Sequence, residues 1–380
     1  MKASIVEDLG RKVIVSVIND LVTDQRVKKV CRSLHEMGFN LVLVGRRMHN
    51  SPRMDARPYP VFRMKLLFEK GPVFYVCFQV RLFIFLLFHR CELLVSNDLD
   101  TLLPNYLVSK LKRIPLVYDS HEYFTGVPEL QNNPLRRKTW KLVERWIFPG
   151  LKDVITVNDS IADLYADEYG IRPVVIRNVP QTGVEIVKKS RLFLSMPEDK
   201  KIMILQGSGI NIRRGAEEMV EAMRFIENAV LFIVGGGDVI NILKEKVKQW
   251  HLEQKVLFKP RQPYETLMQY TAAADLGLSL DKDTNINYRF SLPNKIFDYL
   301  HAGIPVLASD LVEIRKIIDA YQVGDFIPDH QPQHIAQKVN EVFSRPEKLL
   351  QWRRNTKKAA HELNWENESK ILKKIYAKYV

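Results

Sequence analysis

Cysteine is scarce in this sequence of 380 residues, which contains only Cys31, Cys77 and Cys91. An odd number of cysteines, with neither a Cys-x-x-Cys pair nor the Cys/His spacing of a zinc ligand set, argues against a disulfide framework and a structural zinc site. The residues from Met1 to Asp8 also lack the apolar core of a signal peptide. These absences predict a cytoplasmic protein.

Long apolar runs free of charge are missing as well. The most apolar stretch, 73–88, holds Gln79 and Arg81 near its centre and is shorter than the roughly 20 residues of a spanning helix. We therefore expect it in the core of a domain, with the residues just before it at the surface. From Phe62 to Arg90, however, aromatic residues are interleaved with Lys and Arg, which also suits peripheral contact with the inner membrane.

Repeats and biased tracts are not evident, and the charge balance is basic. Lys and Arg number 57 against 44 Asp and Glu, a formal net charge of +13. This excess suits an anionic partner, whether a nucleotide, a nucleic acid or an acidic membrane surface. The basic residues are dispersed and no nucleic-acid reading motif is present, so we expect no nucleic-acid partner.

Short β-branched runs alternate with longer amphipathic stretches through most of the chain, a pattern typical of parallel sheets covered by helices. The length favours two domains. We predict an N-terminal domain over 1–180, a second domain over 181–360 after a linker near 180–200, and a C-terminal helix over 361–380 that returns to the first domain. The predicted strands are 12–18, 40–44, 92–96, 115–119, 154–157 and 174–176, then 201–206, 229–234, 255–258, 276–280 and 305–308.

A glycine-rich loop follows the first strand of the second half. It contains Gly207, Gly209, Asn211 and Arg214. Glycine lets backbone amides approach an anion, and arginine can bind two phosphate oxygens at once. We interpret the loop as a diphosphate site, with an ordinary strand-to-helix turn as the alternative, because neither the P-loop nor the dinucleotide GxGxxG spacing is present.

Two further segments carry chemistry in the second half. Gly236 lies in a Gly-Gly-Gly-Asp turn, which can make room for a base or a ribose. The alternative is an ordinary tight turn into the following helix. The segment 290–306 predicts a helix that begins after Pro293, so that the amides of Asn294 and Lys295 and the Lys295 ammonium face a second phosphate. Asp298, nearly one turn further, is placed to accept the hydroxyls of a ribose.

Acidic residues and one histidine follow strands of both halves. His121 and Glu122 follow the predicted strand 115–119 and are candidate functional side chains, although a lone histidine at a strand end is more often structural. Two Asp-x-Asp pairs are weaker candidates for a metal. We expect Asp98 and Asp100 to cap a helix, and Asp281 and Asp283 to lie in a solvated loop, so that no metal site is predicted.

These motifs together resemble the retaining glycosyltransferases of the GT-B fold, in the large "family four" group found in bacterial surface-polysaccharide synthesis. The clearest likeness is the run Ser-Leu-Pro-Asn-Lys-Ile-Phe-Asp-Tyr-Leu-His-Ala-Gly-Ile-Pro-Val at 291–306, supported by Asp-Ser-His-Glu at 119–122. The resemblance implies an α/β protein of two doubly wound Rossmann-like domains that face each other across a cleft, joined by a C-terminal helical crossover.

The resemblance also implies a function. A sugar would pass from a nucleoside-diphosphate sugar to a glycan or lipid-linked acceptor, with no cofactor and no metal. Arg214 and Lys295 would bind the diphosphate, with Gly207, Gly209, Asn211, Gly236, Pro293 and Asn294 around the nucleotide and Asp298 on the ribose. His121 and Glu122 would act from the other domain.

One departure from the family pattern leaves alternatives open. The family has two acidic residues eight positions apart, and the first of these is Phe290 here. Its loss leaves a nucleotide-sugar epimerase of the same fold, or an inactive interaction subunit, as competing interpretations.

Overall fold

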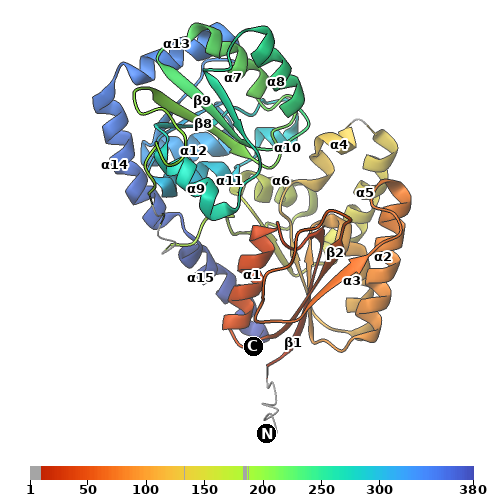
Figure 1. Ribbon diagram of the computed structural model, residues 1–380. Coiled ribbons are helices and arrows are strands. Elements are labelled where there is room, and N and C mark those ends of the chain that lie inside the picture. The colour runs from red at the N-terminus through yellow and green to blue at the C-terminus, as the bar shows by residue number, and fades with distance from the viewer. Residues whose placement is uncertain (1–9, 132, 183–185, 187) are drawn as a thin grey trace, which may run out of the picture. The chain divides into compact units, whose positions relative to one another are not determined.

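A computed structural model describes residues 10–131, 133–182, 186 and 188–380 (Figure 1). The first nine residues, on which the expectation about a signal peptide depends, and part of the predicted linker lie outside the described residues. The chain divides into two compact units: unit 1 comprises Met1–Asn178 and Asn367–Val380, and unit 2 comprises Val179–Glu366. The changes between units therefore fall at 178/179 and 366/367, beside the predicted domain limits at 180 and 360.

Unit 1 is built on a seven-stranded parallel sheet with the strand order β3-β2-β1-β4-β5-β6-β7. The order reverses between β1 and β4, so the helices of the crossovers cover both faces. The strands are β1 (Lys12–Asp20), β2 (Asn40–Arg47), β3 (Val61–Lys65), β4 (Leu93–Asn97), β5 (Leu116–Asp119), β6 (Asp153–Thr156) and β7 (Val174–Val175). The helices are α1 (Gln25–Glu36), α2 (Gly71–Phe88), α3 (Leu99–Lys112), α4 (Pro128–Gln131), α5 (Pro134–Ile147) and α6 (Asp159–Tyr169), with 3-10 turns at Phe124–Gly126 and Phe148–Gly150.

Unit 2 repeats the plan with a six-stranded parallel sheet in the order β10-β9-β8-β11-β12-β13. Its strands are β8 (Lys201–Gly207), β9 (Ala229–Gly235), β10 (Val256–Lys259), β11 (Leu276–Ser279), β12 (Val306–Ala308) and β13 (Gly324–Phe326). Its helices are α7 (Ala216–Ala222), α8 (Ile240–Gln249), α9 (Tyr264–Ala273), α10 (Ile286–Arg289), α11 (Asn294–Ala302), α12 (Val312–Tyr321), α13 (Pro332–Phe343) and α14 (Pro346–Glu362), with a 3-10 turn at Met223–Phe225. The prediction of an α/β protein with two parallel sheets is confirmed.

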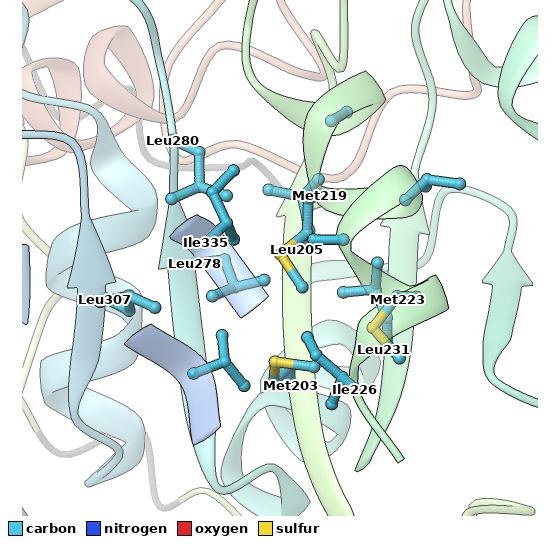
Figure 2. Close-up of a cluster of buried hydrophobic side chains, with 14 of the residues drawn as sticks. Met203, Leu205, Met219, Met223, Ile226, Leu231, Leu278, Leu280, Leu307 and Ile335 are labelled. Atoms are coloured by element: carbon cyan, nitrogen blue, oxygen red, sulfur yellow. The ribbon is translucent and has the colours of Figure 1, made fainter. Parts of the chain in front are cut away.

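The core of unit 2 lies on both faces of its sheet. Successive residues of a strand point to opposite faces, and along β8 Met203 and Leu205 enter one cluster while Ile202 and Ile204 enter another. Figure 2 shows the first cluster, in which Met203 and Leu205 lie among side chains from β9, β11, α7 and α13. The near-continuous apolar strands of this unit therefore result from burial on two sides.

Helix α15 (Trp365–Tyr376), followed by a 3-10 turn at Ala377–Tyr379, covers part of unit 1 with its C-terminal half. Leu372 and Tyr376 are fully buried, and the Tyr376 ring lies 6.3 Å from the ring of Phe39. Tyr379 donates a hydrogen bond to Asp153 at the start of β6. Ile371, which precedes Leu372 in this helix, is exposed.

Two strands and one helix differ from the prediction. The strands β3 and β13 were missed; both are short, lie at sheet edges and carry polar residues among the apolar ones. The stretch 73–88 is a helix, but its expected place in the core is only half right. One side of α2 is buried, whereas Val76 is 61% and Phe88 79% exposed.

Candidate functional site

The candidate site of unit 2 lies where the strand order of its sheet reverses, between β8 and β11. Ligands of open parallel sheets bind beyond the carboxyl ends of the strands at this point. Here β8 ends at Gly207 and the glycine-rich loop follows, while β11 ends at Ser279 and is followed by Leu280 and Asp281. The sheet thus brings the two loops together.

A buried carboxylate joins the two cations that the sequence singles out. Asp281 is fully buried; its Oδ1 atom accepts a hydrogen bond of 2.6 Å from Nε of Arg214, and its Oδ2 atom lies 3.3 Å from Nζ of Lys295. The Arg214 guanidinium also donates to the carbonyl oxygen of Gly209, at 3.2 Å, and lies 5.0 Å from the centre of the Tyr288 ring. Both cations are therefore held side by side by one anion.

Burial and the neighbouring charges together set the pKa values of Asp281 and Lys295. Burial alone would raise the pKa of Asp281, but Lys295 and Arg214 outweigh it and hold that pKa below its usual value. Burial lowers the pKa of Lys295, and the positive Arg214 beside it adds to this effect against the attraction of Asp281. Two cations against one carboxylate leave the group with a net positive charge, which an anionic ligand would offset.

A cavity of about 280 Å³ opens beside the two cations. Its walls come from β8, the glycine-rich loop and the start of α11: Leu205, Gln206, Gly207, Ser208, Gly209, Ile210, Arg214, Leu292, Pro293, Asn294 and Lys295. The amides of Asn294 and Lys295 belong to the first turn of α11, where backbone donors have no partner inside the helix. The cavity thus combines backbone donors with two positive side chains, the chemistry of a phosphate site.

A glycine makes the close approach of the two loops possible. Gly215, just before α7, has φ +78°, and a Cβ atom there would lie 2.1 Å from the carbonyl oxygen of Leu280. Any other residue would push the Arg214 loop away from the segment that carries Asp281. The contact between Arg214 and Asp281 therefore depends on this glycine.

The Gly-Gly-Gly-Asp turn is bonded to the glycine-rich loop. The amide of Gly236 donates to the carbonyl oxygen of Gly207, at 3.1 Å, and the Asp238 carboxylate accepts from the amide of Ile212, at 3.0 Å. In return, the amide of Asp238 donates to Oδ1 of Asn211, at 3.3 Å. The Asn211 side chain thus holds the two loops together through its Oδ1 atom. A nucleotide could use only the hydrogen bonds that this side chain can still form.

Asp298 lies on α11, with its carboxylate positioned by two neighbours. Nε2 of Gln206 donates to Oδ2 at 3.1 Å, and the hydroxyl of Tyr264 donates to Oδ1 at 2.8 Å. Burial, together with the negative Asp298, raises the pKa of Tyr264, which keeps this hydroxyl a donor. Each carboxylate oxygen can accept a second hydrogen bond, so ribose binding by Asp298 stays a prediction.

The loop that follows β11 differs from the expectation of a solvated Asp-x-Asp pair. Asp281 is fully buried, and Asp283 forms an exposed ion pair with Arg289 at 3.0 Å. The two carboxylates therefore face different cations. Phe290 ends the short helix α10. Within the described part of the chain, no group of three His, Cys, Asp or Glu side chains is close enough to hold a metal ion.

A second cluster lies at the carboxyl ends of β4 and β5 in unit 1, around His121. Nδ1 of its ring lies 3.2 Å from Asp98 Oδ2, while Nε2 lies 3.2 Å from Asn97 Oδ1 and 3.7 Å from Asp119 Oδ2. Burial opposes a charge on His121, but the carboxylates of Asp98 and Asp119 outweigh it and raise the pKa of His121 to about 9. At neutral pH His121 is therefore a cation with both ring nitrogens acting as donors. Glu122 follows it and is partly exposed.

Asp98 has an unusual backbone and does not cap a helix as predicted. Although it precedes α3, its side chain makes no capping hydrogen bond; its Oδ1 atom instead accepts from the backbone amide of His121 at 2.8 Å. Its φ of 60° with ψ of 166° lies in a region that is essentially restricted to glycine and is found at functional sites. The strained backbone at Asp98 thus goes together with a carboxylate that holds His121 in place.

A cavity in unit 1 lies at the opposite end of the strands of its sheet, away from His121. This cavity of about 460 Å³ is lined by Lys12, Arg90, Cys91, Glu92, Lys112 and Ile114, beside the starts of β1 and β4. Ligands of parallel sheets bind at the carboxyl ends of strands, so we do not assign it to the chemistry.

Two family models match the chain in sequence order. Residues 24–181 match the model described as "Glycosyltransferase Family 4", and residues 189–359 match "Glycosyl transferases group 1". The chain belongs to the family-four-like glycosyltransferases. Its fold, two separate parallel-sheet α/β units, is the GT-B fold of that family.

Solved structures share this fold over nearly the whole chain at low sequence identity. Sucrose-phosphate synthase from Thermosynechococcus elongatus is 17% identical with a TM-score of 0.78, covering 97% of this chain and 99% of that one. Anabaena Alr3699/HepE in complex with UDP-glucose is 14% identical with a TM-score of 0.74, covering 97% and 100%. At these identities the likeness concerns the fold.

The match to a curated relative spans only part of both sequences. Chitobiosyldiphosphodolichol beta-mannosyltransferase from Candida albicans is 23% identical over 252 residues, which are 60% of this chain and 54% of the relative. The chain spans about half the length of the curated relatives it matches.

Proposed function

We propose that the protein is a retaining glycosyltransferase that moves a sugar from a nucleoside-diphosphate sugar to a glycan or lipid-linked acceptor in cell-surface polysaccharide synthesis. The observation that carries the proposal is the pair Arg214 and Lys295, both held by buried Asp281 beside a cavity lined with glycine and with the first residues of α11. This arrangement suits a diphosphate. Support for a sugar donor comes from the family, and from the UDP-glucose bound to the Anabaena protein of the same fold.

The two cations and the first turn of α11 have a role in the departure of the nucleotide. Negative charge develops on the leaving phosphate in the transition state, and fixed donors that need no reorganisation stabilise it. Arg214 supplies a planar, permanently charged group, whereas Lys295 supplies a point charge that can lose its proton. In a front-face displacement the acceptor oxygen bonds to the anomeric carbon on the face from which the nucleoside diphosphate departs, so the sugar keeps its anomeric configuration. The departing phosphate takes the proton of the acceptor hydroxyl.

His121 is suited to donate hydrogen bonds, and it is unsuited to act as a base. With a pKa of about 9 it is protonated at neutral pH and has no lone pair to accept a proton. We assign it to a hydroxyl of the donor sugar or of the acceptor. Glu122 is the neighbouring group that would accept a hydrogen bond from the same ligand.

A lipid-linked acceptor is favoured by the Candida relative, whose name joins mannosyl transfer to chitobiosyldiphosphodolichol. The donor base and sugar are left to experiment. A thermal-shift panel of UDP, GDP, ADP and CMP compounds identifies the nucleotide, because a ligand that binds only the folded state raises the melting temperature by mass action. The matching sugar nucleotides are then tested for turnover with and without membrane lipid extracts.

The outcomes separate the competing functions. Transfer to an acceptor, with the product anomer determined by NMR, supports the proposal, and an inverted product overturns retention. Interconversion of the sugar nucleotide without an acceptor indicates an epimerase. Failure to bind any nucleoside diphosphate indicates an inactive interaction subunit, which is the reading that Phe290 would favour.

A further inference from the structure

Helix α2 is apolar on its exposed side as well as on its buried side. Phe74, Phe78, Leu82, Phe85 and Leu86 are buried. On the opposite side, an apolar stripe at helical spacing is exposed to solvent: Val73, Val76, Val80, Ile84 and Phe88. A helix on the surface of a soluble domain normally places charged and polar residues on that side. The exposed stripe of α2 is therefore a surface that lacks its partner.

The fold excludes a membrane-spanning role for α2, although it is long and apolar enough for one by length and composition. It connects β3 and β4, two strands of one sheet, so it must lie along that sheet. It is fixed there by contacts of its buried side: the guanidinium of Arg46 lies 4.7 Å from the centre of the Phe74 ring, and Gln79 donates to the carbonyl oxygen of Asp100. Only its outer side can contact a membrane.

Helix α5 packs beside α2 and carries exposed apolar residues of its own. The rings of Tyr75 on α2 and Trp140 on α5 pack edge to face, 5.6 Å apart, and Figure 1 shows the two helices next to each other on one side of unit 1. On α5, Leu135, Leu142 and Trp146 are exposed. We call the exposed stripe of α2 together with these three residues the α2–α5 face.

The surroundings of the α2–α5 face are strongly basic. Five Lys or Arg residues lie in 61–90 and five lie on α5, against one acidic residue in each segment, Glu69 and Glu144. Glu144 is buried and paired with Lys141. The exposed basic residues include Lys70, Arg81, Arg90, Arg136 and Lys138. In the loop that joins β3 to α2, Leu67 is 92% exposed and Phe68 is half exposed.

We propose that the α2–α5 face lies flat on an anionic lipid bilayer, with α2 in the plane of the interface. Apolar and aromatic side chains enter the boundary of the acyl chains while Lys and Arg contact the headgroups, which is the chemistry of an interfacial helix. A second copy of this chain would bring two positive faces together, so charge complementarity favours lipid over self-association.

The position of the face suits the proposed reaction. The amino end of α2 follows β3, and Gln79 on α2 donates to Asp100 in the first turn of α3, which follows β4. The amino ends of both helices therefore lie at the carboxyl ends of the strands, where His121 also lies. This last step rests on the proposed function: an acceptor anchored in the bilayer would present its head group at that edge. Docking itself does not depend on it.

The test is flotation of the full chain with vesicles of phosphatidylglycerol and phosphatidylcholine, without nucleotide. We expect binding that falls as salt is raised, and little binding to pure phosphatidylcholine. Replacing Lys70, Arg136 and Lys138 with Gln should reduce partitioning about a hundredfold at low salt, since each Lys or Arg near an anionic surface contributes about 1 kcal/mol. Replacing Val76, Val80 and Ile84 with Asn should reduce it at least about tenfold.

Matched controls lie in unit 2. Arg354, Lys357 and Lys358 on α14 are exposed, and their replacement with Gln removes the same charge; replacing exposed Leu192, Phe193 and Leu350 with Asn matches the apolar change. Both should bind vesicles like the wild type, and all variants should melt like it and keep nucleotide binding by unit 2.

The proposal is overturned if the wild type does not float with anionic vesicles or if the controls lose binding equally. It is also overturned if light scattering shows a dimer that only the Val76, Val80 and Ile84 variant dissociates, since the face would then join two copies. Vesicle binding without nucleotide binding would defeat the proposed function and leave the docking surface standing.

Discussion

The two strand-end clusters have opposite electrostatic designs. In unit 2 one buried carboxylate, Asp281, lies between two cations. In unit 1 the imidazolium of His121 lies between the carboxylates of Asp98 and Asp119, and Asp119 is also paired with buried Arg26 at 2.7 Å. The first cluster has positive charge to spare and attracts an anion. The second balances the carboxylates of Asp98 and Asp119 with His121 and Arg26, and so presents the hydrogen-bond donors of His121 without an excess of positive charge that would attract phosphate. One sheet architecture thus supports two kinds of site through the balance of charge at its strand ends.

The largest expected effect is the loss of folding stability when the charge cluster of unit 2 is broken. Asp281→Ala should lower the free energy of unfolding by about 3–5 kcal/mol, the range for removing one partner of a buried ion pair. Arg214 cannot lose its proton, so its charge would stay uncompensated. Asp98→Ala should cost less than about 2 kcal/mol, because His121 can become neutral and the backbone strain at Asp98 is relieved.

Urea denaturation of the full chain at pH 7 measures both changes. Asp283→Ala is the control, since its ion pair with Arg289 is exposed and should contribute less than about 1 kcal/mol. Equal losses for Asp281→Ala and Asp98→Ala would contradict the contrast between the clusters.

The second prediction concerns ligand binding by the positive cluster. Arg214→Ala and Lys295→Ala should each weaken binding of the preferred nucleoside diphosphate by about 1.5–3 kcal/mol, the range for a hydrogen bond to a charged group. Calorimetric titration measures the change. Arg213→Ala removes a neighbouring exposed charge and should leave affinity within a factor of about two. Unchanged affinity in both cluster variants would remove the diphosphate assignment.

The third prediction sharpens the contrast by pH. The pKa of His121 is raised in the folded state to about 9 from an ordinary value near 6.5, so its stabilising effect is complete below about pH 6.5 and is lost as the pH rises to 9. The wild type should lose on the order of 2 kcal/mol more than His121→Asn across this window. Denaturation at several pH values measures this. An NMR titration that finds the ring neutral at pH 7.5 would refute the assignment.

The smallest expected effect is that of metal removal. In the proposed mechanism Arg214 and Lys295 supply the positive charge for the leaving phosphate in place of a divalent ion, so we expect turnover to be unchanged by EDTA within error. A rate that falls with EDTA and recovers with Mg²⁺ or Mn²⁺ would contradict this, and would make Asp283 and the loop after β11 the first place to seek a ligand.

Features that depend on local sequence could be predicted. Helix α11 begins after Pro293 and ends at Gly303, and the glycine-rich loop follows β8, because proline, glycine and strand periodicity act on neighbouring residues. Their order along the chain also identified the fold. The sequence could therefore place Arg214 in the loop after β8 and Lys295 in the first turn of α11.

Features that depend on contacts between distant residues could not be predicted. Asp281 is one of several Asp residues after strands, and only the sheet shows that it is buried between Arg214 and Lys295, which are 67 residues and 14 residues away. Gln206 and Tyr264, which position Asp298, carry no motif. The composition of α2 fits a core helix and an interfacial one equally, since periodicity cannot show which side has a neighbour.

The covering of unit 1 by α15 has a consequence for synthesis on the ribosome. The sheet of unit 1 is translated first, yet Leu372 and Tyr376, which are fully buried in it, are translated after all of unit 2. Unit 2 is one continuous segment and can fold as soon as it emerges. Until α15 has been translated, the surface of unit 1 around Phe39 stays uncovered. The domain begun first is thus the one finished last, and its open surface is where a chaperone would be needed.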